Sequence, residues 1–221
     1  MEIRVIHKQL EQDSHKLVAV AGNIGAGKTT LVNLLAKHFG WRAYFEAVDE
    51  NPYLEDFYQD MKRWAFPTQI FFLQSRFTQM LELQQMEESL IQDRTIYEDA
   101  YIFAKNLHQS GTLTDRDYET YLRLFQGVKK MVRTPDLLIY LKASIPTLIR
   151  QIGNRGRAYE TNISLKYLGD LNQHYDDWIA EYREGELLIL DADKLDLLDS
   201  PEDVGLIFRR VQAKLGESLF G

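Results

Sequence analysis

Short apolar runs alternate with longer stretches of helical spacing along most of the chain. Each run has the length and composition of a strand that is buried inside a sheet. The sequence predicts five such strands, at Leu17–Ala21, Trp41–Glu46, Leu90–Asp93, Leu137–Leu141 and Leu187–Leu190.

The stretches between these runs predict helices, and several of their ends carry recognisable signals. The first helix is expected to run from Lys28 to near Gly40, because glycine commonly follows the last helical residue. Pro67 is predicted to lie in the first turn of a helix, where its missing N–H has no helical partner to lose. Thr114 and Ser200 are predicted N-caps, because each hydroxyl can accept a hydrogen bond from the first turn.

Strands that alternate with helices predict an α/β fold, with a parallel sheet covered by helices on both faces. Right-handed crossovers place the carboxyl ends of all strands along one edge, and ligands bind outside that edge. Polar features end three of the predicted strands there, namely the segment from Gly22 onward, Glu46, and Asp93 with Arg94. The convergence of these groups predicts a functional site at this edge.

The composition is that of a soluble globular protein, with 45% hydrophobic and 27% charged residues in a chain of 221. One domain over 1–221 is the simplest interpretation, with 1–16 as either a flexible arm or an extra edge strand. A formal net charge of −7 argues against nucleic acid or an anionic membrane as partner. The lack of cysteine excludes thiolate chemistry, and no apolar run reaches the roughly 18 residues of a membrane span, so a cytoplasmic location is expected.

The segment from Gly22 to Thr29 fits G-x-x-x-x-G-K-[ST], the pattern of a loop that binds the phosphates of a nucleoside triphosphate. A strand before it and a helix after it disfavour a chance glycine-rich turn. Backbone N–H groups and the helix N-terminus would surround the phosphates, Lys28 would reach the β- and γ-phosphates, and the Thr29 hydroxyl would ligate Mg²⁺. The expected ATP-binding residues of the loop are Gly22, Asn23, Ile24, Gly25, Ala26, Gly27, Lys28, Thr29 and Thr30.

The phosphoryl acceptor is indicated by further motifs. The chain has no N-K-x-D motif for guanine, and its length suits a small-molecule kinase. From about residue 17 to 195 an ordered set of motifs resembles the deoxynucleoside kinase family, which includes the deoxycytidine, deoxyguanosine and deoxyadenosine kinases. These motifs are Phe45-Glu46-Ala47, Tyr58, Trp64–Gln69, Asp93-Arg94-Thr95, Arg155–Glu160 and Asp191-Ala192-Asp193.

The resemblance implies a P-loop kinase fold and transfer of the γ-phosphoryl group of ATP to the 5′-hydroxyl of a deoxynucleoside. Glu46, at a strand end, can accept the proton of that hydroxyl as a general base, or pair with a cation such as Arg94, or do both. The donor fork of Arg94 can hold Glu46 and the 5′-oxygen in place. Asp93 can order the Mg²⁺ shell through water, or cap the next helix.

Two arginines in a short cationic stretch, Arg155 and Arg157, suit a lid that closes over the triphosphate and neutralises charge in the transition state. The alternative is a solvated basic turn. Tyr58 and Glu160 resemble the pair that holds the sugar 3′-hydroxyl in this family, although Tyr58 could equally be an aromatic residue at the core edge. In this family the loop that contains Asp193 contacts the adenine of ATP.

The predicted base pocket is centred on Gln69, whose amide matches both the N6/N7 edge of adenine and the N4/N3 edge of cytosine. Arg76 and Asp99 match a pair that lies beneath the base in the purine and cytosine kinases of the family; the alternative is a structural salt bridge. Phe72 and Phe103 can stack on the base or belong to the core.

The compact lid resembles bacterial members of the family, for which deoxyadenosine and deoxyguanosine are the usual substrates. Deoxyadenosine is our first expectation, with deoxyguanosine or deoxycytidine as alternatives. Many animal relatives carry a tryptophan where this chain has Asn51, so the sugar pocket is expected to be lined differently. A nucleoside monophosphate kinase and a nucleotide sensor without catalysis are the remaining hypotheses.

Two regulatory and assembly features are also expected. The product-derived triphosphate dATP would inhibit by feedback, with its base in the acceptor pocket and its phosphates at the loop. A homodimer would form through the apolar sides of Phe71–Met86 and Tyr97–Leu107. A sedimentation mass of one chain at micromolar concentration would reject the dimer.

Overall fold

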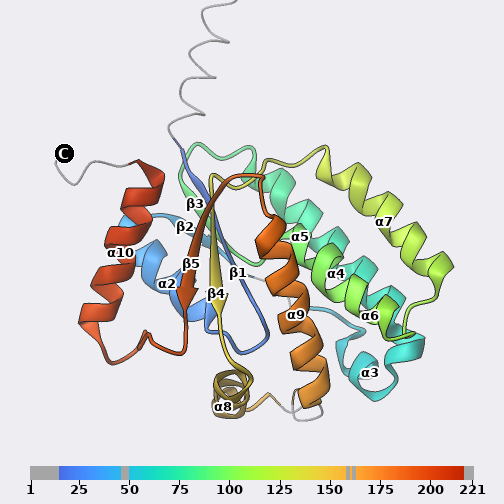
Figure 1. The fold of residues 1–221 in the computed structure, drawn as a ribbon. Helices are drawn as coiled ribbons and strands as arrows, with labels where there is room; N and C mark the ends of the chain where they lie inside the picture. Colours follow the sequence, from blue (N-terminus) through green and yellow to red (C-terminus); the bar gives the residue numbers. More distant parts are fainter. Residues whose placement is uncertain (1–14, 46–49, 158–159, 161–162, 217–221) are drawn as a thin grey trace, which may run out of the picture.

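Five parallel strands form the centre of the computed structural model, which describes residues 15–45, 50–157, 160 and 163–216 (Figure 1). The order across the sheet is β2-β3-β1-β4-β5, and every neighbouring pair is parallel. The predicted α/β class and five-stranded parallel sheet are confirmed. The strands are β1 (Leu17–Gly22), β2 (Arg42–Tyr44), β3 (Leu90–Asp93), β4 (Leu137–Lys142) and β5 (Glu186–Asp191).

Strand β2 is shorter than the predicted strand Trp41–Glu46. Trp41 is buried but precedes the paired residues, and the pairing with β3 ends at Tyr44. Glu46 lies outside the described residues.

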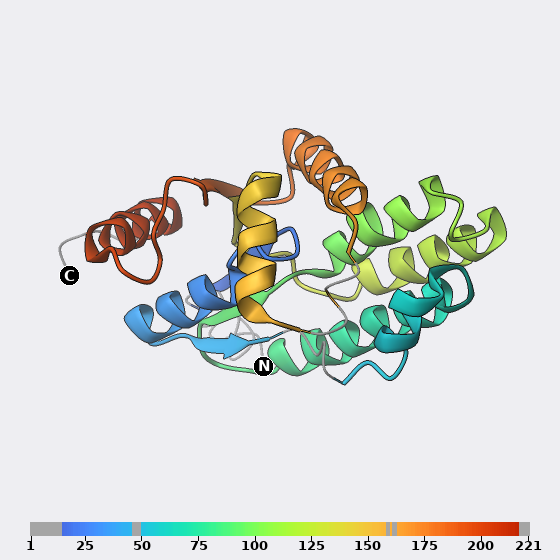
Figure 2. The ribbon, with the colours of Figure 1, turned by 90° about the horizontal axis from the view of Figure 1, so that it is seen from below.

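Helices cover both faces of this sheet, as predicted (Figures 1 and 2). Helices α2 and α10 pack on one face, while α9 and the π-helical turn η1 pack on the other. The helical elements are α2 (Lys28–Phe39), α3 (Leu54–Gln59), α4 (Met61–Leu83), α5 (Ile96–Glu98), η1 (Asp99–Ala104), α6 (Lys105–Gln109), α7 (Asp115–Lys129), α8 (Ile145–Arg155), α9 (Leu165–Glu181) and α10 (Pro201–Leu215).

Alternate residues of β1 serve the two faces, because successive side chains of a strand point in opposite directions. Val18 and Val20 belong to the core formed with α2 and α10. Ala19 and Ala21 belong to the core formed with α9 and η1. Both sets are completely buried, which explains why this strand reads as a continuous apolar run.

A further core joins the helices from α3 to α7, which Figure 2 shows grouped beside the sheet. Part of the predicted dimer interface is used here, because most apolar residues of the segment Tyr97–Leu107 are buried within the chain itself. On α4, Leu73 and Met80 are buried in the same core, whereas Leu81 is exposed. The homodimer therefore stays a prediction, and the segment Tyr97–Leu107 is not a free face for it.

Most predicted helix ends are confirmed. Helix α2 ends before Gly40, which has the left-handed φ of 69° that favours glycine. The Thr114 hydroxyl accepts a hydrogen bond from the Asp117 N–H at 3.2 Å and caps α7. The Ser200 hydroxyl caps α10 in the same way.

The prediction for Pro67 is wrong. Helix α4 begins at Met61 and is capped by the Asp60 carboxylate, which accepts a hydrogen bond from the Arg63 N–H at 3.2 Å. Pro67 therefore lies inside the helix rather than in its first turn. The missing N–H would have bonded the carbonyl of Arg63, an exposed residue that water can reach, so the helix continues through the proline.

Lys16, directly before β1, bonds to the start of β3, at the opposite end of these strands from the phosphate loop. The Lys16 N–H donates to the Ser89 hydroxyl at 3.0 Å, and the Lys16 carbonyl accepts from the Leu90 N–H at 2.7 Å. Residues 1–14 lie outside the described residues, so the choice between arm and edge strand stays open. Within the described part of the chain, no helix combines the length and apolar character needed to cross a membrane.

Candidate active site

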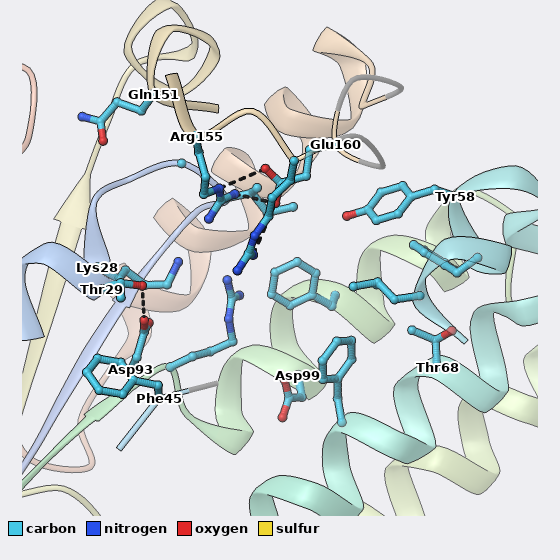
Figure 3. A pocket seen from close by; sticks show the side chains of 18 of the residues that line it. Lys28, Thr29, Phe45, Tyr58, Thr68, Asp93, Asp99, Gln151, Arg155 and Glu160 are labelled. Atoms are coloured by element: carbon cyan, nitrogen blue, oxygen red, sulfur yellow. Dashed lines mark hydrogen bonds and ion pairs between the residues drawn. The ribbon is translucent and has the colours of Figure 1, made fainter. Parts of the chain in front are cut away.

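A cavity of about 530 Å³ opens at the carboxyl ends of β1 and β3. Figure 3 shows Lys28, Thr29 and Asp93 on one side of it and Tyr58 and Thr68 on the other. Most of the residues predicted from the sequence line this single cavity, although they come from widely separated segments. These residues are Ile24, Gly25, Gly27, Lys28, Thr29, Thr30, Tyr58, Gln69, Phe72, Asp93, Arg94, Asp99, Phe103, Arg155, Arg157 and Glu160.

Other predicted residues do not line the cavity. These are Gly22, Asn23 and Ala26 of the phosphate loop, together with Arg76 and Asp193. Glu46 is outside the described residues. Two further lining residues, Phe45 and Thr68, belong to the quoted motifs but were given no role from the sequence. The remaining ones lie in no motif: Leu54, Phe57, Gln151 and Tyr167.

The phosphate loop has the backbone conformation that its glycines allow. Gly25 and Gly27 have φ values of 81° and 94°, in the left-handed region that other residues rarely adopt. A Cβ atom on Gly25 would lie 2.8 Å from the Leu148 carbonyl oxygen and 2.8 Å from the Ile152 side chain. The loop therefore packs directly against α8, and only glycine fits between them.

The loop is also tied to helix α9 through Asn23. Its side-chain amide donates to the Leu168 carbonyl at 3.0 Å and to the Asn172 side chain at 2.7 Å. The Lys28 ammonium group donates to the backbone carbonyl of Asn23 at 3.1 Å. The Asn23 side chain therefore anchors the loop, and its contact with ATP stays a prediction.

The two predicted metal-binding residues are in direct contact. The Thr29 hydroxyl donates to Oδ2 of Asp93 at 2.6 Å. The other oxygen, Oδ1, is buried and has no hydrogen-bond partner among the described residues. A hydroxyl and a carboxylate oxygen with unused capacity at a phosphate loop fit Mg²⁺, which prefers oxygen ligands.

Arg94 follows β3 in an unusual backbone conformation. Its φ of 75° makes it the one described residue other than glycine with a positive φ. Its N–H donates to the Val20 carbonyl at 2.9 Å, and its guanidinium donates to the Tyr175 hydroxyl at 3.2 Å and lies over the Phe103 ring at 4.4 Å. The backbone turn thus aims a buried cation at the cavity.

The cap of the next helix is Thr95 rather than Asp93, so that alternative for Asp93 is wrong. Thr95 and Glu98 form a capping box at the start of α5. The spacing T-x-x-E could have revealed it from the sequence. Glu98 is completely buried, and this burial raises the pKa of its carboxyl although the Arg94 and Lys28 charges oppose the shift.

Arg76 and Asp99 form a buried ion pair, with Nε and Oδ2 2.8 Å apart. Arg76 also donates to the backbone carbonyls of Asp93 and Arg94 at 3.5 and 3.4 Å. The pair therefore links α4 to the end of β3, as a structural salt bridge would. Because only Asp99 lines the cavity, any effect of Arg76 on a base acts through Asp99.

The lid residues are paired with each other. Arg155 makes two hydrogen bonds to the Glu160 carboxylate, one of them from Nε at 3.0 Å, and Arg157 lies 3.8 Å from the same group. Glu160 is buried, whereas Arg155 remains exposed on the cavity rim. Figure 3 shows the Tyr58 hydroxyl on the side of its ring that faces Arg155 and Glu160. The two arginines predicted to close over the triphosphate thus lie in the same part of the cavity as Tyr58 and Glu160, the predicted sugar contacts.

Asp193 is placed away from this group. Its two carboxylate oxygens accept hydrogen bonds from the Ser144 N–H at 3.1 and 3.3 Å. Ser144 precedes the first residue of α8, so the Asp193 side chain caps that helix. The contact of the Asp193 loop with the adenine of ATP stays a prediction.

A glycine-rich loop at the carboxyl edge of a parallel sheet, followed by a helix and facing a deep cavity, defines a P-loop nucleotide-binding enzyme fold. The chain belongs to the deoxynucleoside kinase family, whose model matches residues 18–215. It is 36% identical to the deoxyadenosine/deoxycytidine kinase of Bacillus subtilis, over 92% of this chain and 95% of that protein. It is 43% identical to the deoxyadenosine kinase of Dictyostelium discoideum, over 80% and 71% of the two chains.

Solved structures show the same relationship. The deoxyadenosine kinase of M. mycoides with dCMP and dCDP bound superposes with a TM-score of 0.81 at 31% identity, covering 89% of this chain and 99% of the other. The same enzyme with bound dATP gives 0.79 at 32% identity, covering 90% and 100%. The protein is thus a deoxynucleoside kinase by family, as its motifs predicted.

The buried pair beneath the cavity yields a stability prediction. Arg76→Met leaves the Asp99 carboxylate buried without its cation, which should lower the free energy of unfolding by about 3–5 kcal/mol. Arg76→Met combined with Asp99→Leu removes both charges and should recover part of that loss. Urea denaturation of the three proteins measures the difference.

Arg42→Met is the matched control, because the Arg42–Glu88 pair is about half exposed and screened by water, so its loss should change stability much less. An Arg76→Met protein no less stable than Arg42→Met would contradict a buried pair at this site.

Proposed function

We propose that this protein transfers the γ-phosphoryl group of ATP to the 5′-hydroxyl of a deoxynucleoside, with deoxyadenosine preferred. The observation that carries the proposal is that the phosphate loop and an aromatic pocket open into one cavity of about 530 Å³. That volume suits a nucleoside and the end of a triphosphate together. The relatives named as deoxyadenosine kinases support the choice of base.

The donor side is formed by the phosphate loop and the lid. Backbone N–H groups of the segment 24–30 and the Lys28 ammonium would bind the phosphates at the N-terminus of α2. Arg155 and Arg157 would neutralise charge that develops during transfer. Thr29 and Asp93 would hold Mg²⁺, which neutralises charge on the β- and γ-phosphate oxygens when bound.

The acceptor side is formed by α3, α4 and the residues after β3. Tyr58 and Glu160 would share the sugar 3′-hydroxyl, and Glu160 would keep its contact with the lid arginines. Gln69 would read the base, and its Oε1 is buried without a hydrogen-bond partner among the described residues. Phe72 and Phe103 would flank the base.

Deoxycytidine is the second candidate substrate. The Gln69 amide matches the cytosine edge as well as the adenine edge. The relative from Bacillus subtilis is named as a kinase of both nucleosides, and the structures from M. mycoides contain cytidine nucleotides as well as dATP.

A substrate panel tests this function. With ATP and Mg²⁺, deoxyadenosine should give the highest kcat/KM, followed by deoxycytidine and deoxyguanosine, because the larger purine fills the aromatic pocket and Gln69 pairs with the adenine amine. Adenosine is the matched control and should react at least about tenfold less well, because Tyr58 crowds the 2′-hydroxyl. Turnover of dAMP without turnover of any deoxynucleoside would show a monophosphate kinase instead.

The general base is tested by Glu46→Gln. The amide cannot accept the proton of the 5′-hydroxyl, so kcat should fall by about 10²- to 10⁴-fold while both KM values change little. Glu50→Gln, an exposed carboxylate in the same segment, is the control and should keep the wild-type rate. Steady-state kinetics measure both, and a Glu46→Gln enzyme within about threefold of wild type would remove Glu46 from the mechanism.

Feedback inhibition follows from the same cavity. We propose that dATP binds with its base in the acceptor pocket and its phosphates at the loop, as a bisubstrate-like inhibitor. The M. mycoides relative with bound dATP supports binding of this nucleotide. Inhibition should be competitive against both ATP and the deoxynucleoside, and purely uncompetitive kinetics would refute it.

A further inference from the structure

Glu98 is a completely buried carboxyl group whose contacts exceed those of a helix cap. Its Oε2 accepts hydrogen bonds from the Thr95 N–H at 2.8 Å and the Thr95 hydroxyl at 3.3 Å. These two bonds cap α5, and they use only one of the two carboxyl oxygens. The second oxygen is therefore available for a different purpose.

That second oxygen, Oε1, joins three elements at the edge of the cavity. It accepts from the Gly22 N–H at 3.3 Å, lies 2.7 Å from the Tyr175 hydroxyl, and lies 3.8 Å from Nη1 of Arg94. Gly22 begins the phosphate loop, Tyr175 belongs to α9, and Arg94 directly follows β3. None of these contacts stabilises α5.

The Tyr175 hydroxyl contacts both Glu98 and the phosphate loop. The Tyr175 hydroxyl lies 2.8 Å from the Gly22 carbonyl and 2.7 Å from Oε1 of Glu98, but it carries one hydrogen. The hydroxyl donates to both oxygens through this single hydrogen, so it links the Gly22 carbonyl to Glu98. Burial raises the pKa of the Glu98 carboxyl.

The same hydroxyl restrains Arg94. A φ of 75° is unfavourable for arginine, so the conformation persists only where neighbours hold it. The backbone is held by Val20, and the guanidinium donates to the Tyr175 hydroxyl at 3.2 Å. Tyr175 therefore contacts both the first residue of the phosphate loop and the cation on the acceptor side.

We propose that Glu98 and Tyr175 are positioning residues for phosphoryl transfer, which fix the start of the phosphate loop at Gly22 relative to the Arg94 guanidinium. Neither lines the cavity, so both act through Gly22 and Arg94. Their spacing matters because transfer rates fall steeply when reacting groups are misplaced by about an ångström. The inference rests on the proposed function, in which the loop holds ATP and Arg94 serves the acceptor.

Tyr175→Phe tests the inference with little change in packing. Loss of the hydroxyl should lower kcat about tenfold, while KM for ATP and for deoxyadenosine stays within about twofold, because binding groups remain and only their relative placement changes. Tyr182→Phe is the control, since it removes another buried hydroxyl at the end of α9 that has no hydrogen-bond partner among the described residues. It should keep the wild-type kcat.

Glu98→Ala and the combined Glu98→Ala/Tyr175→Phe enzyme complete a double-mutant cycle. The combined enzyme should be no slower than Glu98→Ala alone, because the two residues act as one unit. If the kcat losses of the two single variants multiply in the combined enzyme, the proposal is overturned. It is also overturned if Tyr175→Phe has the same kcat as Tyr182→Phe, or if Tyr175→Phe changes only KM. If Glu98→Ala does not fold, the comparison of the two tyrosine variants decides.

The outcome also separates this inference from the proposed function. A wild-type enzyme that phosphorylates no deoxynucleoside overturns both. An active wild-type enzyme whose Tyr175→Phe variant keeps full kcat overturns the positioning role alone.

Discussion

The pairing of β1 with β3 is the constraint on which the site depends. Val20 lies opposite Asp93, and the Val20 carbonyl accepts a hydrogen bond from the next residue, Arg94. Because parallel strands end at the same edge, this register brings the loop after β1 beside the two charged residues after β3. The contact between Thr29 and Asp93 at 2.6 Å follows directly from it. A shift of one residue would turn Asp93 to the other face of the sheet.

The charge distribution of the protein is uneven in a way that suits its ligands. The chain carries a formal net charge of −7, yet Lys28, Arg94, Arg155 and Arg157 line one cavity. Lys28 and Arg155 have defined partners, an Asn23 carbonyl and a Glu160 carboxylate. Such prior positioning reduces the rearrangement needed when phosphate charge arrives, which is the main source of electrostatic catalysis.

The parts of the structure that could be predicted are those with a local signal. Strands β1, β3 and β4 are buried runs, and the phosphate loop is a contiguous motif, so both were found from the sequence. Pro67 was misplaced because α4 begins at the Asp60 cap, about two turns before Pro67 and the apolar stripe that follows it. The contact of the Asp193 side chain with Ser144 had no local signal, because the two residues are 49 positions apart. Glu98 was overlooked because its contacts with Gly22 and Tyr175 span 76 and 77 residues.

The backbone conformation at position 94 is one that favours glycine, although the residue there is arginine. Glycine is the residue that a φ of 75° favours, and a glycine there would relax the chain at no steric cost. It would also delete the cation that this turn presents to the cavity. A more stable backbone at this position therefore conflicts with the proposed role of Arg94 in phosphoryl transfer.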